Sequence, residues 1–291
     1  LAALQARSAA APTTTVSISG TCYRSTSLRL NASHAHAKFV SGPAGGTISG
    51  GLAVPPLAWR PAAGSLWTAQ LPVGALNASA LPNQLWAMGN RRPRARHPNL
   101  LAQADDGGLG VIEQPWMFWD KPLCPTPSSA GPCSAEDKLG LHWRAADDAV
   151  MRGVAHDPTG QLEAVVYHSW TDSRHHVVET DLTNRTLRFS NPSFAAIGLT
   201  PNYHWGAEVI PSESGQRYYL ENHASLLDKV GEWFLAPNGT LWFWPTADEL
   251  ALLQARRLEV VLPLVEELIV INGSADIAFE GLALLHSDWA V

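Results

Sequence analysis

The sequence predicts an all-β protein that is rich in turns. Short apolar segments follow one another from residue 13 onwards, among them TTTVSISG and SLRLNA, and each is closed by a Gly, Asn or Pro. This pattern is typical of short strands joined by turns. Gly (23) and Pro (21) together make up 44 of the 291 residues, and the 3.6-residue periodicity of long amphipathic helices is nearly absent.

Further strands are expected along most of the chain, in TISGGLAV (47–54), SLWTAQLPV (65–73), LEAVVYHSW (162–170), HHVVETDL (175–182) and TLRFSN (186–191). The stretch 109–143 is irregular and rich in Pro, Trp and Cys. The segment EWFLAPNGTLWFWP (232–245) places two aromatic strands around Pro-Asn-Gly, which predicts a hairpin. In TADELALLQARR (246–257), Thr246 and Glu249 have the spacing of a capping box, which predicts a short helix.

The C-terminal stretch 258–289 contains short apolar strands separated by Asn-Gly and Glu-Gly corners. Such a succession is typical of the stacked rungs of a parallel β-solenoid. Because the sequence stops in mid-pattern, we expect a solenoid that is cut off after one or two of these rungs.

Composition and charge exclude several classes of function. With 20 Lys and Arg against 26 Asp and Glu, the formal net charge is −6, so no nucleic-acid partner is expected. No apolar run reaches the roughly 18 residues of a membrane span. Phosphate loops, dinucleotide fingerprints and Ser or Cys nucleophile motifs are lacking, and His34 and His36 have no neighbouring Asp or Cys to complete a metal site. We therefore expect neither a cofactor nor a metal.

The chain begins at Leu1 without a signal sequence, as a mature chain or an excerpt does. N-glycosylation sequons are more frequent than chance supplies and favour a secreted or cell-surface protein; they lie at Asn31, Asn77, Asn184, Asn238 and Asn272. Cys124 and Cys133 bracket the turn-rich loop CPTPSSAGPC, which could close as a disulfide. The alternative is a pair of unrelated buried thiols.

An ordered set of phrases extends over nearly the whole chain. These are TISGG (47–51), a W…G…W…P stretch (59–72), LWAMGNRRPRARHPN (85–99), HSWTDSRHHVVETDLTNRTLRFSNP (168–192), RYYLENHASLLDKVGEWFLAPNGTLWFWP (217–245) and DIAFEGLALLHSDW (276–289). In this order they resemble the secreted right-handed parallel β-helix proteins of the glycoside hydrolase family 141 type. The match is loose between residues 100 and 165.

The resemblance implies a right-handed parallel β-helix, with its N-terminal cap and first rungs in 1–104 and its continuing rungs in 256–291. A smaller antiparallel β insertion domain, 105–255, interrupts it. The implied function is hydrolysis of a cell-wall or extracellular polysaccharide. A polysaccharide lyase and a non-catalytic carbohydrate-binding or adhesion module remain alternatives. The family's catalytic carboxylates lie on later rungs, beyond Val291, so we expect no hydrolysis by this chain alone.

The densest group of charges is Arg91, Arg92, Arg94 and Arg96. Arg94 and Arg96 point to one face of a strand, where they can clamp the carboxylates of a uronic-acid sugar. Alternatively, they form a structural clamp that satisfies buried carbonyls and acids at a domain junction. Both interpretations stay open at this point, with the structural clamp favoured.

Other candidate residues lie near the C-terminal end. His286, Asp288 and Trp289 combine an aromatic ring with a histidine and an acid, as the edge of a sugar subsite does; a packed solenoid corner is the alternative. Adjacent carboxylates at 105–106, 147–148 and 266–267 are expected to be solvated rather than catalytic. His175 and His176 are expected to face solvent on opposite sides of a strand. Trp233, Trp242 and Trp244 are expected to serve packing.

Overall fold

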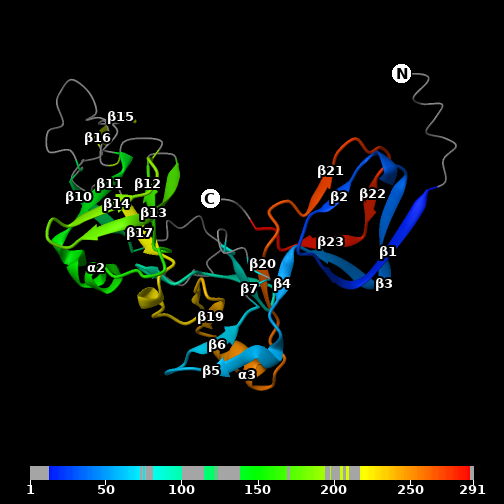
Figure 1. Ribbon diagram of the computed structural model, residues 1–291, viewed down its shortest axis with the longest axis horizontal. Coiled ribbons are helices and arrows are strands. Elements are labelled where there is room, and N and C mark those ends of the chain that lie inside the picture. Colours follow the sequence, from blue (N-terminus) through cyan, green and yellow to red (C-terminus); the bar gives the residue numbers. More distant parts are fainter. Residues whose placement is uncertain are drawn as a thin grey trace. The chain divides into compact units, whose positions relative to one another are not determined.

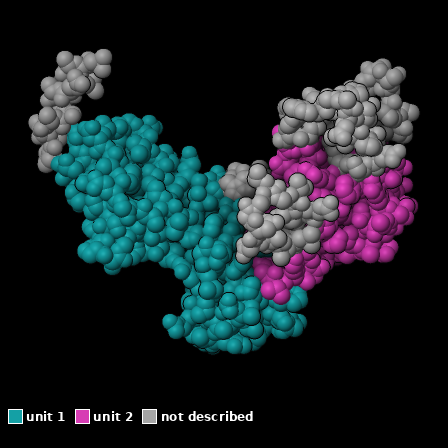
Figure 2. Space-filling model, turned by 180° about the vertical axis from the view of Figure 1, so that it is seen from behind, with its two compact units in different colours: residues 1–93, 237–291 teal, residues 94–236 magenta. Residues whose placement is uncertain are grey.

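The computed structural model describes residues 13–72, 74, 76, 81–99, 115–121, 123, 138–168, 171–193, 197, 204–205, 208–209 and 217–288. Strands dominate this part of the chain, which confirms the predicted all-β class (Figure 1). The chain divides into two compact units, shown in Figure 2: unit 1 comprises residues 1–93 and 237–291, and unit 2 comprises residues 94–236.

These boundaries differ from the division at 104/105 and 255/256 that the sequence led us to expect. Strand β19 (Thr240–Phe243) and helix α3 (Ala247–Gln254) belong to unit 1. Both elements have their partners in unit 1. Strand β19 forms an antiparallel pair with β6 (Trp67–Gln70), and Glu249 of α3 accepts a hydrogen bond from Arg92 Nε at 2.7 Å.

Unit 1 is built around parallel strand pairs. Strand β3 (Ala37–Ser49) pairs in parallel with β1 (Thr14–Tyr23), β22 (Ala278–Glu280) and β23 (Leu282–Leu285), and β2 (Leu28–Leu30) pairs in parallel with β21 (Ile269–Ile271). The segments TISGG and DIAFEGL, which are more than 200 residues apart in the chain, thus contribute to one sheet.

Side chains in register form ladders across these parallel strands. Phe39 and Phe279 are paired residues of β3 and β22, and their rings stack with centroids 5.0 Å apart. Leu30, Ala37 and Phe39 are buried and pack against Ile18 and other aliphatic side chains. Burial of these apolar side chains stabilises the parallel strands.

Gly46 allows the central strand to approach its neighbours closely. A Cβ atom there would lie 2.4 Å from the carbonyl oxygen of Ile18 and 2.7 Å from Cδ2 of Leu282. Both distances are shorter than van der Waals contact, so only glycine fits where β1, β3 and β23 come together.

Antiparallel sheets complete unit 1. One contains β4 (Gly51–Ala53), β20 (Val260–Pro263), β7 (Leu85–Ala87) and β8 (Asn90–Arg92) in that order, and β5 (Trp59–Pro61) pairs with β6. The predicted capping box is confirmed: Thr246 caps α3, its hydroxyl accepts from the Glu249 amide, and the Glu249 carboxylate accepts from the Thr246 amide at 2.7 Å.

Unit 2 contains an antiparallel sheet in the order β10-β11-β14-β13-β12-β17-β9, with β10 also paired to β17. The strands are β9 (Arg96–His97), β10 (Met117–Lys121), β11 (Gly140–Trp143), β12 (Glu163–Tyr167), β13 (Asp172–Asp181), β14 (Thr186–Phe189) and β17 (Arg217–Glu221). Outside this sheet lie β15 (His204–Trp205), β16 (Glu208–Val209), β18 (Trp233–Leu235) and helix α2 (Asp148–Val154). The three strands expected between 162 and 191 correspond to β12, β13 and β14.

One face of the unit 2 sheet carries the core. Ala164, Val166, Tyr218 and Leu220 alternate along β12 and β17 and are fully buried.

No helix in the described part of the chain is long and apolar enough to cross a membrane.

We expect Gly46→Ala to destabilise unit 1 by about 1–3 kcal/mol, because the added methyl group overpacks three strands. The midpoint of urea unfolding reports this loss. The control is Gly153→Ala in α2, where the nearest atom to a Cβ lies at 3.6 Å and alanine favours the helix. An equal loss in both variants would contradict the close-approach argument.

Candidate functional site

The second face of the unit 2 sheet is polar and aromatic. Glu163 pairs directly with Glu221, and Val165 pairs with both Arg174 and Tyr219. Because side chains alternate along a strand, residues at every second position share a face. We call this the polar face; its members are Arg96, Glu163, Tyr167, Asp172, Arg174, His176, Arg217, Tyr219 and Glu221.

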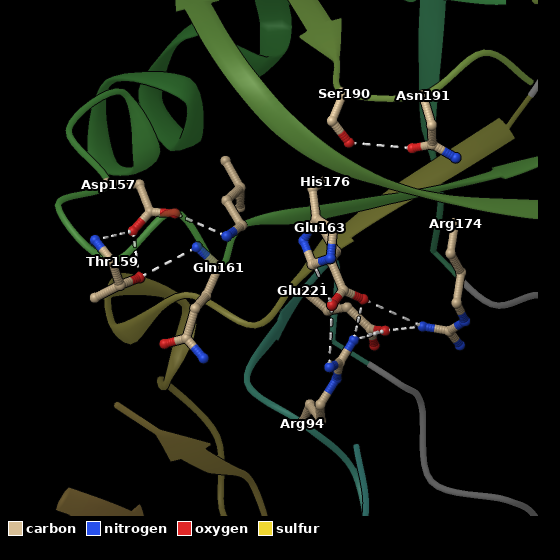
Figure 3. Close-up of polar contacts among 11 residues, drawn as sticks. Arg94, Asp157, Thr159, Gln161, Glu163, Arg174, His176, Ser190, Asn191 and Glu221 are labelled. Atoms are coloured by element: carbon tan, nitrogen blue, oxygen red, sulfur yellow. Dashed lines mark hydrogen bonds and ion pairs between the residues drawn. The ribbon is translucent and has the colours of Figure 1, made fainter. Parts of the chain in front are cut away.

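A buried ion network lies at the centre of the polar face (Figure 3). Arg94, which precedes β9, contacts Glu163 through Nη2 and, at 3.3 Å, through Nη1; its Nη2 also lies 2.6 Å from Glu221 Oε1. Arg174 contacts Glu221 and lies 3.8 Å from Glu163. Arg94, Glu163 and Glu221 are only 4–6% exposed. Two cations therefore neutralise two anions inside the unit.

Charge pairing decides the protonation state of this network. Burial by itself raises the pKa of Glu221, but the guanidinium groups of Arg94 and Arg174 outweigh burial and hold that pKa below 4.5. Burial and the negative charge of Glu221 raise the pKa of Tyr219 to about 12, so its hydroxyl stays protonated and can accept the hydrogen bond that Arg174 Nη2 donates at 3.3 Å.

This arrangement supports the structural clamp predicted as one role of the arginines. A glycosidase acid needs a raised pKa, and its partner carboxylate needs access to the sugar. Glu221 has a lowered pKa and is buried with Glu163 against the same guanidinium. Arg96 is also committed, since its Nε donates to the Pro98 carbonyl at 3.1 Å and its guanidinium lies 3.7 Å from the Tyr219 ring centre.

The edge of the polar face is open and aromatic. The Trp116 ring lies 4.9 Å from that of Tyr167, edge to face, and 6.3 Å from that of Tyr219. The guanidinium of Arg217 lies 5.1 Å from the Trp116 ring centre and 5.2 Å from that of Tyr167. Arg217 is exposed and the rings of Trp116 and Tyr167 are half-buried, so this group is accessible to a ligand.

A pocket of about 530 Å³ lies beside β13, lined by Val154, Asp157, Leu162, His176, Val178 and Glu179 among others. Asp157 is occupied by local contacts, because it accepts from the amides of Thr159 and Leu162 at 2.9 and 2.7 Å. His176 is exposed and lies 4.0 Å from Glu163. Asp157 therefore stabilises the 157–162 turn, and the other acidic lining residue, Glu179, lies 3.5 Å from Arg188.

In unit 1, the predicted residues His286 and Asp288 each contact a residue that is distant in the chain. His286 Nδ1 lies 2.9 Å from Ser49 Oγ, and its ring meets Trp86 edge-on at 5.6 Å. Asp288 accepts from the Asn83 amide at 3.2 Å. Burial lowers the pKa of His286. These contacts are those of a packed corner; Trp289 lies outside the described residues.

The other charged candidates separate from one another. Arg92 belongs to unit 1 and pairs with Glu249, so it does not join the Arg94 network, and Arg91 is exposed. Asp148 binds Arg185 and the Trp143 indole, which lower its pKa to about 2. Glu266 and Glu267 are exposed, as expected, and Asp105–Asp106 lie outside the described residues.

Among the described carboxyl groups, buried Glu232 has the most strongly raised pKa. Burial raises its pKa to about 8, although the amides of Asp228 and Lys229 each donate to Oε2 at 3.2 Å. The side chain closes the 228–232 turn and is only 1% exposed. Sealed in this way, it has no access to a substrate.

The expectation of two solvent-facing histidines is wrong for His175. His176 is exposed, but His175 lies on the core face, stacks on Phe189 at 4.6 Å and approaches the Asn191 carbonyl oxygen at 3.2 Å. The pairing register, which the sequence alone does not reveal, decides which of two adjacent residues faces the core.

His36 lies 3.0 Å from Asp276, and no group of three or more metal-ligating side chains occurs in the described part.

The sequons that the structure describes, Asn31, Asn184, Asn238 and Asn272, are all exposed. Asn77, Cys124 and Cys133 lie outside the described residues, so the disulfide stays a prediction; Cys22 is an exposed free thiol. Trp233 is buried, in line with its expected packing role, and Trp242 and Trp244 are half-buried.

Sequence reasoning did not single out Glu163, Arg174, Glu221 or the Trp116–Tyr167–Arg217 group. The signal is present in EAVVY and RYYLE, where charged and aromatic residues occupy alternate positions. Reading it requires knowing that these two strands are neighbours.

No protein-family model matches the chain, and no curated protein matches it. A solved structure described as a glycoside hydrolase is similar to it, with a TM-score of 0.65 and 20% sequence identity. The similarity covers 94% of this chain and 43% of that chain. The chain thus spans less than half of that protein's length, and at this identity the likeness establishes a shared fold.

Replacing Arg94 tests the ion network. We expect Arg94→Met to cost about 3–5 kcal/mol at pH 7, because two buried carboxylates lose a partner. As the pKa of Glu221 is lower in the folded protein than its ordinary 4.5, the network stabilises the wild type fully above pH 4.5 and less as pH falls through the folded value. The cost of Arg94→Met should therefore shrink in acid.

The control is Lys38→Met, which breaks an exposed pair with Glu280 at 2.8 Å and should cost less than about 1 kcal/mol. Urea unfolding at pH 7 and at pH 4 measures both variants. A similar, small loss in both would show that the Arg94 network is not a structural clamp.

Proposed function

We propose that this chain is part of a secreted, carbohydrate-active protein of the glycoside hydrolase kind, acting on a cell-wall or extracellular polysaccharide. The observation that carries the proposal is the structural match to a glycoside hydrolase over 94% of the chain. The exposed sequons at Asn31, Asn184, Asn238 and Asn272 are consistent with an extracellular location.

The proposal includes a finer description of the fold. We infer that the parallel strands of unit 1 begin a right-handed parallel β-helix and that unit 2 is the insertion that interrupts it. Support comes from the parallel register of β3 with β1, β22 and β23, and from the stacked Phe39 and Phe279 rings. Such ladders of like residues are typical of stacked rungs.

The catalytic carboxylates are proposed to lie outside the described residues. Hydrolysis of a glycoside needs one protonated and one ionised carboxyl facing the scissile bond. Three described carboxyl groups with shifted pKa values have other partners: Glu221 contacts the arginines, Asp148 contacts Arg185, and Glu232 closes its turn. The role of this chain in catalysis is then to provide framework and substrate contacts.

A non-catalytic carbohydrate-binding module is the second candidate, favoured by the open group of Trp116, Tyr167 and Arg217 on unit 2. Aromatic rings beside a few polar groups are a common lining of ligand sites. The two candidates differ in one respect: only the first requires that a longer chain containing this one cleaves the polysaccharide it binds.

Affinity electrophoresis and a reducing-sugar assay test the proposal on the purified 291-residue chain, with neutral and acidic plant, algal and bacterial polysaccharides. We expect retardation of the protein by at least one polysaccharide and no release of reducing ends. Retardation by none of them would contradict the carbohydrate proposal. Release of reducing ends would show that this chain contains the catalytic pair. Loss of that activity in His286→Ala or Asp288→Asn would place the pair at these residues.

A further inference from the structure

We propose that Trp116, Tyr167 and Arg217 form a subsite for a carboxylate-bearing sugar, a uronate unit of an acidic polysaccharide. We call it the acid-sugar subsite. The inference rests on the proposed carbohydrate function and adds to it the chemical class of the substrate and the place where it binds.

The aromatic rings supply the surface on which a pyranose packs. Trp116 and Tyr167 are half-buried and meet edge to face, an arrangement that fixes both rings without burying them completely. Tyr219 packs behind them, with its ring 6.2 Å from that of Tyr167, and is itself held by Arg96 and Arg174. The rings are therefore preorganised, which lowers the entropic cost of binding.

Arg217 supplies the charge. It is exposed, and no Asp or Glu of the described residues lies within ion-pair distance of it, whereas Arg94 and Arg174 are neutralised by Glu163 and Glu221. Cation–π contacts with Trp116 and Tyr167, at 5.1 and 5.2 Å from the ring centres, hold the Arg217 guanidinium beside both rings. A planar guanidinium matches a carboxylate in a bidentate way.

The order of the strands spaces the polar groups to fit one sugar ring. Asp172 of β13 pairs directly with Tyr167 of β12, and Arg217 of β17 lies on the other side of Tyr167, next to the Val166–Tyr218 pair. Neighbouring strands are about 4.8 Å apart, so the Cα atoms of Asp172 and Arg217 are about 10 Å apart, with that of Tyr167 between them. Asp172 is exposed and can accept hydrogen bonds from sugar hydroxyl groups while the carboxylate binds at Arg217.

This geometry separates the acid-sugar subsite from the arginines that the sequence suggested for the same role. Arg94 and Arg96 are buried; Arg94 contacts Glu163 and Glu221, and Arg96 Nε donates to the Pro98 carbonyl. Arg217 is on the same polar face but at its exposed end, where a ligand can reach it.

Isothermal titration with a uronate oligosaccharide and a neutral oligosaccharide of equal length tests the subsite. We expect wild-type protein to bind the uronate about 10-fold more tightly, with the preference falling at high salt. Arg217→Gln should remove the preference, Arg217→Lys should keep part of it, and Trp116→Phe should weaken both ligands alike. Arg188→Gln, which changes an exposed arginine 3.5 Å from Glu179, is the matched control and should change neither affinity.

Thermal unfolding of each variant verifies that it is folded before binding is compared. Equal affinities for the two oligosaccharides, or a preference that Arg217→Gln leaves intact, would overturn the acid-sugar subsite while leaving the carbohydrate function in place. Binding of neither oligosaccharide, together with no retardation by any polysaccharide, would overturn the proposed function itself.

Discussion

The Arg94–Glu163–Glu221–Arg174 network is the constraint on which the polar face of unit 2 depends. Two carboxylates stand directly opposite each other on adjacent strands, an arrangement that is repulsive unless cations are interposed. Arg94 and Arg174 provide those cations in a buried setting, where an unpaired charge is costly. The network thereby fixes the positions of β9, β12, β13 and β17, and Tyr219 with them.

The polar face then divides by accessibility. In its buried part, guanidinium groups and carboxylates neutralise one another, so that part gives rigidity. At its exposed end, Arg217 lies beside Trp116 and Tyr167 and has no carboxylate partner among the described residues, so that end can recognise a ligand. A rigid support behind an accessible group is what a preorganised binding site requires. In unit 1, by contrast, the predicted His286 and Asp288 are engaged in holding a corner.

Local signals in the sequence predicted local structure well. The Thr246–Glu249 capping box and the strands between 162 and 191 both occur in the structure. The site depends on partners 69 and 127 residues from Arg94 in the chain, and no local pattern identifies such partners. Likewise His175 faces the core because of its register with β12, so the expectation that it faces solvent failed for lack of long-range information.

The central claim is that Glu221 is a structural counter-ion to Arg94 and Arg174 rather than a general acid. The most direct test is the NMR titration of the Glu221 side-chain carboxyl carbon, assigned by comparison with Glu221→Gln. The account predicts a pKa below the ordinary 4.5, because Arg94 and Arg174 stabilise the ionised form more than burial opposes it. A pKa raised to about 6 or higher, as a general acid requires, would contradict it.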